Sequence, residues 1–179
     1  MDLILETERL ILREILPKDA EALFELDGNP NVHRYVGNNP VTSIEQVRDY
    51  IENIQNQYAT NGIGRFAVVL KETNEVIGWS GIKFITEPEN NYVDFYEIGY
   101  RLQEKHWGKG YGFESAKAWL ECGFDVMNIP KIYASANKEN SNSIKILEKI
   151  GMKIVSEFLW NEIPCYWFEV ENERFKNVD

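Results

Sequence analysis

Cysteine and histidine are scarce in this chain of 179 residues, which has two of each. The cysteines, Cys122 and Cys165, are too few for the disulfide framework of a small secreted domain. Two histidines and two scattered cysteines also lack the spacing of a zinc site. We therefore expect a protein with no structural disulfides and no metal.

Long apolar runs are also missing. None approaches the roughly 20 residues that a membrane-spanning helix needs. The first six residues have neither the basic nor the apolar region of a signal peptide. We therefore expect a cytoplasmic protein with no membrane partner. Because repeats, low-complexity stretches and linkers are absent as well, we expect a single domain over residues 1–179.

Basic residues are in the minority. The chain has 19 lysines and arginines against 29 aspartates and glutamates, for a net charge of −10. This balance argues against a nucleic-acid partner, because such binding depends on lysine and arginine. It suits a cationic substrate such as an amine, although acidity can also serve solubility alone.

The hydrophobic pattern predicts helices and strands in mixed order. Strands are expected over residues 9–15, 65–71, 76–85, 94–102, 132–136, 152–160 and 165–170. Helices are expected over residues 17–27, 43–61, 113–126 and 140–150, with a loop over 28–40. Several strand pairs read as hairpins, and one strand–helix–strand crossover over residues 92–136 places two strands in parallel. The predicted fold class is α/β, with a mostly antiparallel mixed sheet and helices on both faces.

The most informative segment is the run Trp-Gly-Lys-Gly-Tyr-Gly at residues 107–112, between a predicted strand and a predicted helix. Its glycines let the backbone turn tightly and approach a ligand. The N–H groups that open the helix have no internal partner, so they favour phosphate oxygens, and Lys109 adds charge. The run matches neither the dinucleotide fingerprint nor the P-loop. A helix entry that merely needs flexible residues is the alternative.

Four segments, in this order, resemble the GNAT N-acetyltransferases, and within them the RimJ/RimL-type branch. They are residues 6–13 (ETERLILR), 97–100 (EIGY), 107–112 (WGKGYG) and 140–152 (NSNSIKILEKIGM). The resemblance covers about residues 5–170 and implies the GNAT acyl-CoA acyltransferase fold. It also implies transfer of an acetyl group from acetyl-CoA to a primary amine. Two departures matter: Trp107 replaces the usual Gln or Arg, and Leu147 replaces a tyrosine acid.

The resemblance further implies which residues hold acetyl-CoA. The cofactor-binding set is Tyr100, Leu102, Trp107, Gly108, Lys109, Gly110, Tyr111, Gly112, Asn137, Asn140 and Ser143. The backbone near Leu102 is expected to bind the pantetheine arm and the thioester oxygen. Asn140 can instead be a plain helix N-cap, and Ser143 can make a local hydrogen bond instead.

For catalysis, the resemblance and the local sequence indicate Glu97 and Ser143. Glu97 is the candidate general base and a substrate contact, with a structural role on the other sheet face as the alternative. Ser143 is the candidate proton donor to the thiolate. His33 and Tyr35, in the loop after the first helix, are candidate substrate contacts.

The acceptor amine is less constrained by the sequence. Deprotonating a lysine-like amine at pH 7 costs roughly 4–5 kcal/mol, whereas an α-amine costs about 1 kcal/mol. Because Leu147 leaves the site without the usual acid, an N-terminal α-amine of a protein or peptide is preferred. A polyamine or aminoglycoside-like amine is the alternative, as is a non-catalytic acyl-CoA-binding module. Both a monomer and a homodimer remain open.

Overall fold

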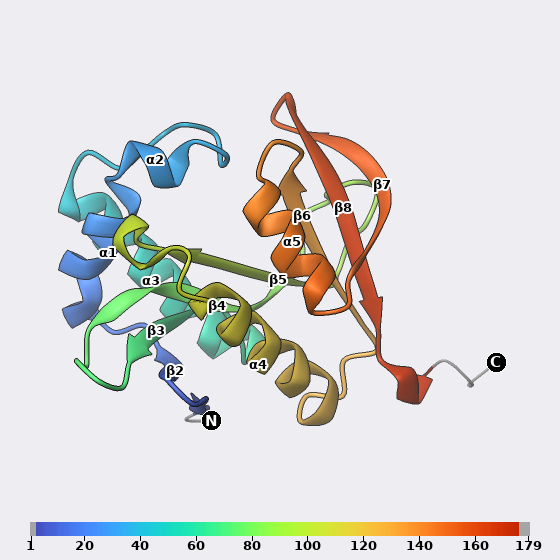
Figure 1. Ribbon diagram of the computed structural model, residues 1–179, viewed down its shortest axis with the longest axis horizontal. Helices are drawn as coiled ribbons and strands as arrows, with labels where there is room; N and C mark the ends of the chain where they lie inside the picture. Colours follow the sequence, from blue (N-terminus) through green and yellow to red (C-terminus); the bar gives the residue numbers. More distant parts are fainter. Residues whose placement is uncertain (1–2, 176–179) are drawn as a thin grey trace.

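A computed structural model describes residues 3–175 (Figure 1). One eight-stranded sheet runs in the order β1-β2-β3-β4-β5-β6-β8-β7. The strands are β1 (Leu5–Glu6), β2 (Leu10–Glu14), β3 (Phe66–Leu70), β4 (Val76–Ile85), β5 (Phe95–Leu102), β6 (Lys131–Asn137), β7 (Lys153–Trp160) and β8 (Ile163–Glu171). The helices are α1 (Ala20–Asp27), α2 (Pro30–His33), α3 (Ile44–Asn61), α4 (Tyr111–Asp125) and α5 (Ser141–Lys149), with 3₁₀ turns η1 (Pro17–Asp19), η2 (Glu104–His106) and η3 (Glu173–Phe175).

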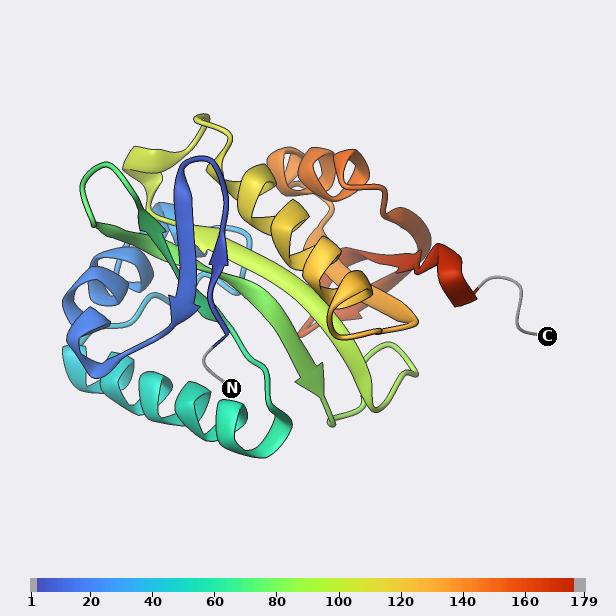
Figure 2. The ribbon, with the colours of Figure 1, turned by 90° about the horizontal axis from the view of Figure 1, so that it is seen from below.

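Helices cover both faces of the sheet, as the sequence predicts. Helices α1 and α3 pack on one face, and α4 and α5 pack on the other (Figure 2). Strand β3 shows why both faces are apolar: Phe66 and Val68 belong to the α4 side, whereas Ala67 and Val69 belong to the α1–α3 side. A strand that is buried on both faces has no polar position, which explains its continuous apolar run.

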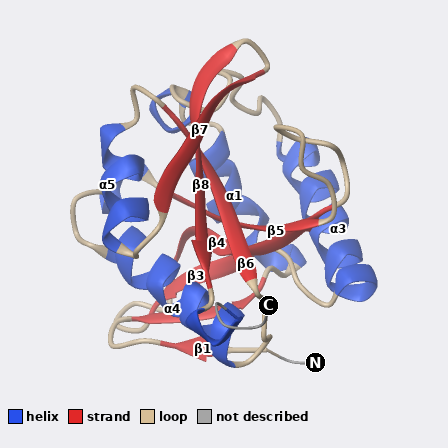
Figure 3. Ribbon diagram, turned by 90° about the vertical axis from the view of Figure 1, so that its right-hand side faces the viewer, coloured by secondary structure: helices blue, strands red, loops and turns tan. Residues whose placement is uncertain are grey.

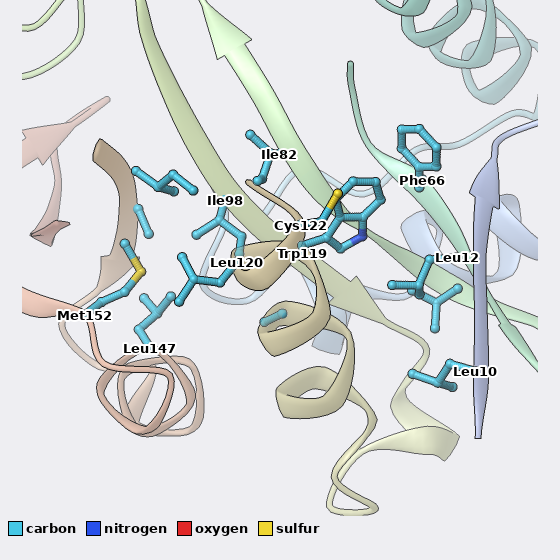
Figure 4. Close-up of a cluster of buried hydrophobic side chains, with 14 of the residues drawn as sticks. Leu10, Leu12, Phe66, Ile82, Ile98, Trp119, Leu120, Cys122, Leu147 and Met152 are labelled. Atoms are coloured by element: carbon cyan, nitrogen blue, oxygen red, sulfur yellow. The ribbon is translucent and has the colours of Figure 1, made fainter. Parts of the chain in front are cut away.

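Trp119 lies at the centre of the core on the α4 side (Figure 4). Its side chain is fully buried, and its ring centroid lies 4.6 Å from that of Phe66. Ala116 and Leu120, which the helical pattern predicts to face inward, flank it and are buried too. The apolar face of α4 therefore anchors the helix whose N-terminus opens the glycine loop.

Replacing Trp119 with alanine should reduce the free energy of unfolding by about 3–5 kcal/mol, because a large buried ring is exchanged for a cavity. Urea unfolding followed by circular dichroism measures this loss. The Leu159→Ala variant, at an apolar side chain that is 69% exposed, is the control and should change stability little. Equal losses in the two variants would contradict the central position of Trp119 in the core.

Two short elements escape the sequence prediction. Strand β1 has two residues, and α2 has four, starting at Pro30 after the N-cap Asn29. Both are too short to produce a periodic pattern, so residues 28–40 were wrongly expected to be loop throughout. Helix α3 begins and ends as predicted: Ser43 forms a capping box, and Gly62 ends the helix in the left-handed conformation. Helix α4 begins two residues before the predicted Phe113, and residues 17–19 form a 3₁₀ turn before α1. No helix in residues 3–175 has the length and hydropathy of a membrane span.

The parallel pair β5 and β6 opens a gap in the sheet. The two strands pair at Tyr96–Ile132 and Glu97–Tyr133. Beyond these positions β5 stays with β4 as far as Leu102, while β6 stays with β8 as far as Asn137. In Figure 1, β5 crosses the view almost horizontally whereas β6 and β8 run steeply, and Figure 3 shows the same crossing from the side.

Candidate active site

The backbone of β5 offers hydrogen-bonding groups to this gap. The Gln103 N–H donates to the Ile77 carbonyl on β4 (2.9 Å), so residues 99 and 101 of this antiparallel ladder also bond to β4. The alternating residues, Tyr100 and Leu102, therefore direct their N–H groups away from β4, toward the side that β6 has left. Unpaired strand groups of this kind can bind an extended ligand as an additional strand would.

The glycine run at residues 107–112 leads into α4 with the backbone geometry of an anion-binding site. Gly108 and Gly110 have φ of +73° and +85°, in the left-handed region that favours glycine. The Gly110 carbonyl accepts the first helical hydrogen bond, from the Glu114 N–H (3.0 Å). The N–H groups of the first turn therefore have no intrahelical partner and are free to bind phosphate.

Two side chains hold this loop to the sheet. Trp107 donates its indole N–H to the Leu102 carbonyl (2.7 Å), which ties the loop to the end of β5. Arg9 donates to the Lys109 carbonyl (2.9 Å), and its Nη2 lies 2.6 Å from an oxygen of Glu114 on α4. The loop is thus fixed before any ligand arrives, which lowers the entropic cost of binding.

On the other side of the gap lies the N-terminus of α5. The Tyr100 hydroxyl donates to the Ser143 carbonyl (3.1 Å) and lies 3.2 Å from the Ser143 hydroxyl. Burial raises the pKa of Tyr100 far above its usual value, so this hydroxyl stays protonated at neutral pH. Asn140 accepts from the Ser143 N–H (3.2 Å) and Asn137 accepts from the Glu139 N–H (2.8 Å). The N-cap role of Asn140 is therefore confirmed.

A cavity of about 810 Å³ connects this gap to the α1–α3 face. It reaches Tyr100, Asn137 and Ser143 at one end, and α1, α2 and α3 at the other. Four acidic and three basic side chains line it: Asp27, Asp49, Glu89 and Glu97, against Arg65, Lys83 and Arg101. Burial raises the pKa of Glu89 and lowers the pKa of Lys83. The cavity is thus a mixed-charge environment rather than an acidic channel.

Glu97 forms an ion pair with Arg65. Arg65 Nη2 lies 2.5 Å from Glu97 Oε2, and Nη1 donates to the Gly81 carbonyl (2.6 Å) and to the Glu97 carbonyl (3.0 Å). Gly81 and Gly99 face each other on β4 and β5: the backbone of residues 64–66 lies over Gly81, and the Arg65 guanidinium lies over Gly99. A Cβ atom at Gly99 would come within 2.8 Å of Arg65 Nη2. The sheet therefore uses two glycines to seat a buried arginine.

A second cluster of charged groups lies further along β5. Arg101 Nη1 lies 2.6 Å from Asp27 Oδ1, and His33 Nε2 lies 3.4 Å from the same oxygen. The Arg65 and Arg101 guanidinium carbons lie 5.2 and 5.1 Å from the Trp79 ring centroid. The arginines of the two ion pairs thus both contact one aromatic ring that lines the cavity.

The cavity unites half of the predicted site residues. Glu97, Tyr100, Asn137, Asn140, Ser143, His33 and Tyr35 all line it, as does Leu147 from the slot expected to hold an acid. Residues 107–112 lie instead at the start of α4, joined to β5 through Trp107. No cluster of three potential metal ligands occurs in the part of the chain that the structure describes.

Sequence reasoning missed Asp27, Arg65, Trp79 and Arg101. A usable signal for Arg65 was the presence of Gly81 and Gly99 inside predicted strands, because a strand glycine often marks the close approach of another group. Asp27 and Arg101 gave no local signal, since each reads as an ordinary polar position and their pairing joins α1 to β5.

The sequence is similar to that of known acetyltransferases. The family model described as an acetyltransferase (GNAT) domain matches residues 9–153. This chain belongs to the GNAT acetyltransferase family. The N-acetyltransferase p20 of Bacillus licheniformis, itself uncharacterized, is 37% identical over 149 residues, covering 83% of this chain and 82% of that protein.

Two further similar proteins have names that give different acceptors for the acetyl group. The spermidine N(1)-acetyltransferase of Escherichia coli K12 is 27% identical over 155 residues, covering 83% of this chain and 75% of that enzyme. The structure of RimL, a ribosomal L7/L12 α-N-protein acetyltransferase in complex with coenzyme A, superposes with a TM-score of 0.79. It is 19% identical, covering 94% of this chain and 98% of RimL, so it shows the shared fold.

As a GNAT acetyltransferase, the protein transfers an acetyl group from acetyl-CoA to an amine. Membership of this enzyme family favours an enzyme over the alternative of a non-catalytic acyl-CoA-binding module. The site fits the co-substrate: a preformed anion loop stands at the start of α4, and unpaired β5 backbone faces the gap. Acetyl-CoA supplies the reactive thioester when it is bound.

Proposed function

We propose that this GNAT enzyme acetylates the N-terminal α-amine of a peptide or protein, as the RimJ/RimL-type branch does. The Arg65–Glu97 ion pair on the cavity wall carries this proposal. An α-amino-acyl group places an amine and a carbonyl oxygen on neighbouring carbons. A carboxylate beside a guanidinium complements that arrangement, because one binds the amine and the other the carbonyl.

A polyamine fits the same wall less well. Its charges are all positive, and the cavity presents Arg65, Lys83 and Arg101 to it. Asp27 is already paired with Arg101, so it offers no free carboxylate to the second ammonium group of a polyamine. The relationship to the E. coli spermidine enzyme makes a small amine the second candidate. The lower cost of deprotonating an α-amine also favours a peptide or protein N-terminus over a polyamine.

We further propose that acetyl-CoA binds along the glycine loop and the free edge of β5. The backbone of residues 107–112, with Lys109, would hold the pyrophosphate at the α4 N-terminus. The Tyr100 and Leu102 N–H groups would bind the pantetheine arm and the thioester oxygen, where such preorganised donors matter most. Asn137 and Asn140 would contact the cofactor arm.

On the catalytic side, we assign Ser143 as the hydrogen-bond donor to the departing thiolate, held in place by Tyr100. Glu97 would bind the acceptor amine, with His33 and Tyr35 lining the same cavity. The ion pair favours this binding role over the role of general base. A proton placed on Glu97 would remove the counter-ion of the buried Arg65 guanidinium, which is a costly change.

An acceptor panel tests the proposal. Acetyl-CoA-dependent thiol release should be measured with peptides that begin with Ser or Ala, with spermidine and with an aminoglycoside. N-acetylated copies of the peptides are the matched control. We expect kcat/KM for free peptides to exceed that for spermidine by about 100-fold or more, because a polyamine has no carbonyl oxygen to accept a further hydrogen bond from Arg65. A higher kcat/KM for spermidine would contradict the α-amine assignment.

A further inference from the structure

The fold leaves one ring nitrogen of a cavity histidine without a hydrogen-bond partner among the described residues. His33, the last residue of α2, is 7% exposed and lines the cavity. Its Nε2 faces the Asp27 carboxylate, whereas its Nδ1 is buried without a hydrogen bond from the described residues. Buried polar groups are almost always paired in proteins. An unpaired Nδ1 on a ring that lines the cavity therefore indicates a partner that the substrate supplies.

The groups around His33 set its tautomer and charge. Its Nε2 lies 3.4 Å from the Asp27 carboxylate, which favours a proton on Nε2 and leaves a lone pair on Nδ1. Burial and the Arg101 charge lower the pKa of His33, and Asp27 opposes them only in part. The ring is therefore neutral at neutral pH and able to accept a proton.

Accepting a proton is also electrostatically feasible at this position. The imidazolium would face the Asp27 carboxylate, which offsets in part the burial and the Arg101 charge that oppose protonation. Glu97 differs, since its protonation would leave Arg65 uncompensated. Of the two groups, His33 is thus the better proton acceptor.

We propose that His33 is the general base of acetyl transfer, with Nδ1 taking a proton from the acceptor ammonium directly or through one water. The free amine then attacks the thioester carbonyl carbon, which forms the C–N bond and breaks the C–S bond. Coenzyme A departs as a thiolate and takes up the second nitrogen proton. His33 returns its proton to solvent, so one proton is released in each turnover. This inference needs an amine acceptor of any class and does not depend on the α-amine proposal.

Chemical rescue tests this role. Replacing His33 with alanine should lower kcat at neutral pH by about 100-fold or more, which is the usual contribution of a general base. Acetyl-CoA affinity should stay unchanged. Added imidazole should restore a large part of kcat, and the rescue should grow as the imidazole becomes neutral. An activity close to that of the unmodified enzyme, a change in KM alone, or a loss that imidazole does not repair would overturn the proposal.

His106 provides a matched control. It is also 7% exposed, its ring nitrogens also lack partners among the described residues, and burial also lowers its pKa. Its Nε2 lies 3.7 Å from Glu75, which Lys105 neutralises, but its ring lies outside the cavity. Imidazole should therefore leave kcat of the His106→Ala variant unchanged. Equal rescue of both variants would show that the effect is not specific to the His33 position.

The pH profile provides a second test that does not require the His33→Ala variant to fold. The charged groups facing His33 are Asp27 from α1 and Arg101 from β5, and Tyr50 from α3 faces the same pair. As the pH falls through the lowered pKa of His33, the ring is protonated and kcat should fall; this decrease is the acidic limb of the pH profile of kcat. Asp27 raises the pKa of His33, so the Asp27→Asn variant should shift the acidic limb to lower pH. A limb that does not move, or moves upward, would overturn the proposal.

Discussion

Replacing Gly110 with glutamate should abolish measurable acetyl-CoA binding while the chain remains folded. Gly110 is the N-cap of α4 and has φ of +85°, a conformation that costs a residue with a Cβ about 1–3 kcal/mol. The added carboxylate would occupy the position proposed for the pyrophosphate and repel it. Together we expect the Kd for acetyl-CoA to rise by about 100-fold or more, which corresponds to roughly 3 kcal/mol. Isothermal titration with acetyl-CoA measures it.

Gly62→Glu is the matched control for this substitution. Gly62 ends α3 with φ of +71°, nothing lies within 4 Å of an added Cβ, and the residue does not line the cavity. The control therefore introduces the same charge and a similar backbone strain away from the loop. Acetyl-CoA binding should be retained in it. If the Gly110→Glu variant bound acetyl-CoA as tightly as this control, the pyrophosphate assignment would be wrong.

Replacing Glu97 with glutamine should lower kcat/KM for the amine by about 100- to 1,000-fold. Glutamine nearly preserves the shape of the side chain but removes the charge that neutralises Arg65. Breaking one partner of a buried ion pair typically costs 3–5 kcal/mol, and part of that loss should appear as weaker amine binding. Acetyl-CoA affinity should not change, since Glu97 faces the α1–α3 side of the sheet. Steady-state kinetics with varied amine, together with titration of acetyl-CoA, separate the two effects.

The control for Glu97 is Glu75→Gln, which removes a carboxylate that is paired with Lys105 (2.8 Å) outside the cavity. Its kcat/KM should match that of the unmodified enzyme. In the Glu97→Gln variant the acidic limb of kcat should persist, because we assign that limb to His33. Disappearance of the limb in this variant would return the role of general base to Glu97.

Much of the fold follows from local sequence patterns. The α4 helix shows this well: its apolar face fixes its orientation, and the glycine run before it sets where its N-terminus begins. The parallel pairing of β5 with β6 follows from the connection through α4, which returns the chain in the same direction. These features depend on residues close together in the chain, so a single sequence reveals them.

The acceptor side of the cavity is less accessible to sequence reasoning. Arg65 and Glu97 are 32 positions apart, and Asp27 and Arg101 are 74 positions apart. A charged residue on a helix or strand is usually solvated, so nothing local shows that these four form two ion pairs. Trp119 is a similar case in the core, because the helical pattern marked its neighbours but not the ring that fills the space against Phe66.

The sequence by itself determined that this chain is an α/β protein with an anion loop between a strand and a helix, and it identified the GNAT resemblance. Those properties rest on periodicity, turn residues and short motifs, which act over a few residues. The tertiary structure alone decided that Glu97 is paired with Arg65, and that His33 is buried with Nε2 beside Asp27 and Nδ1 without a hydrogen-bond partner among the described residues. Burial and charge pairing depend on which distant segments meet in space, and that is settled only when the sheet and its helices pack together.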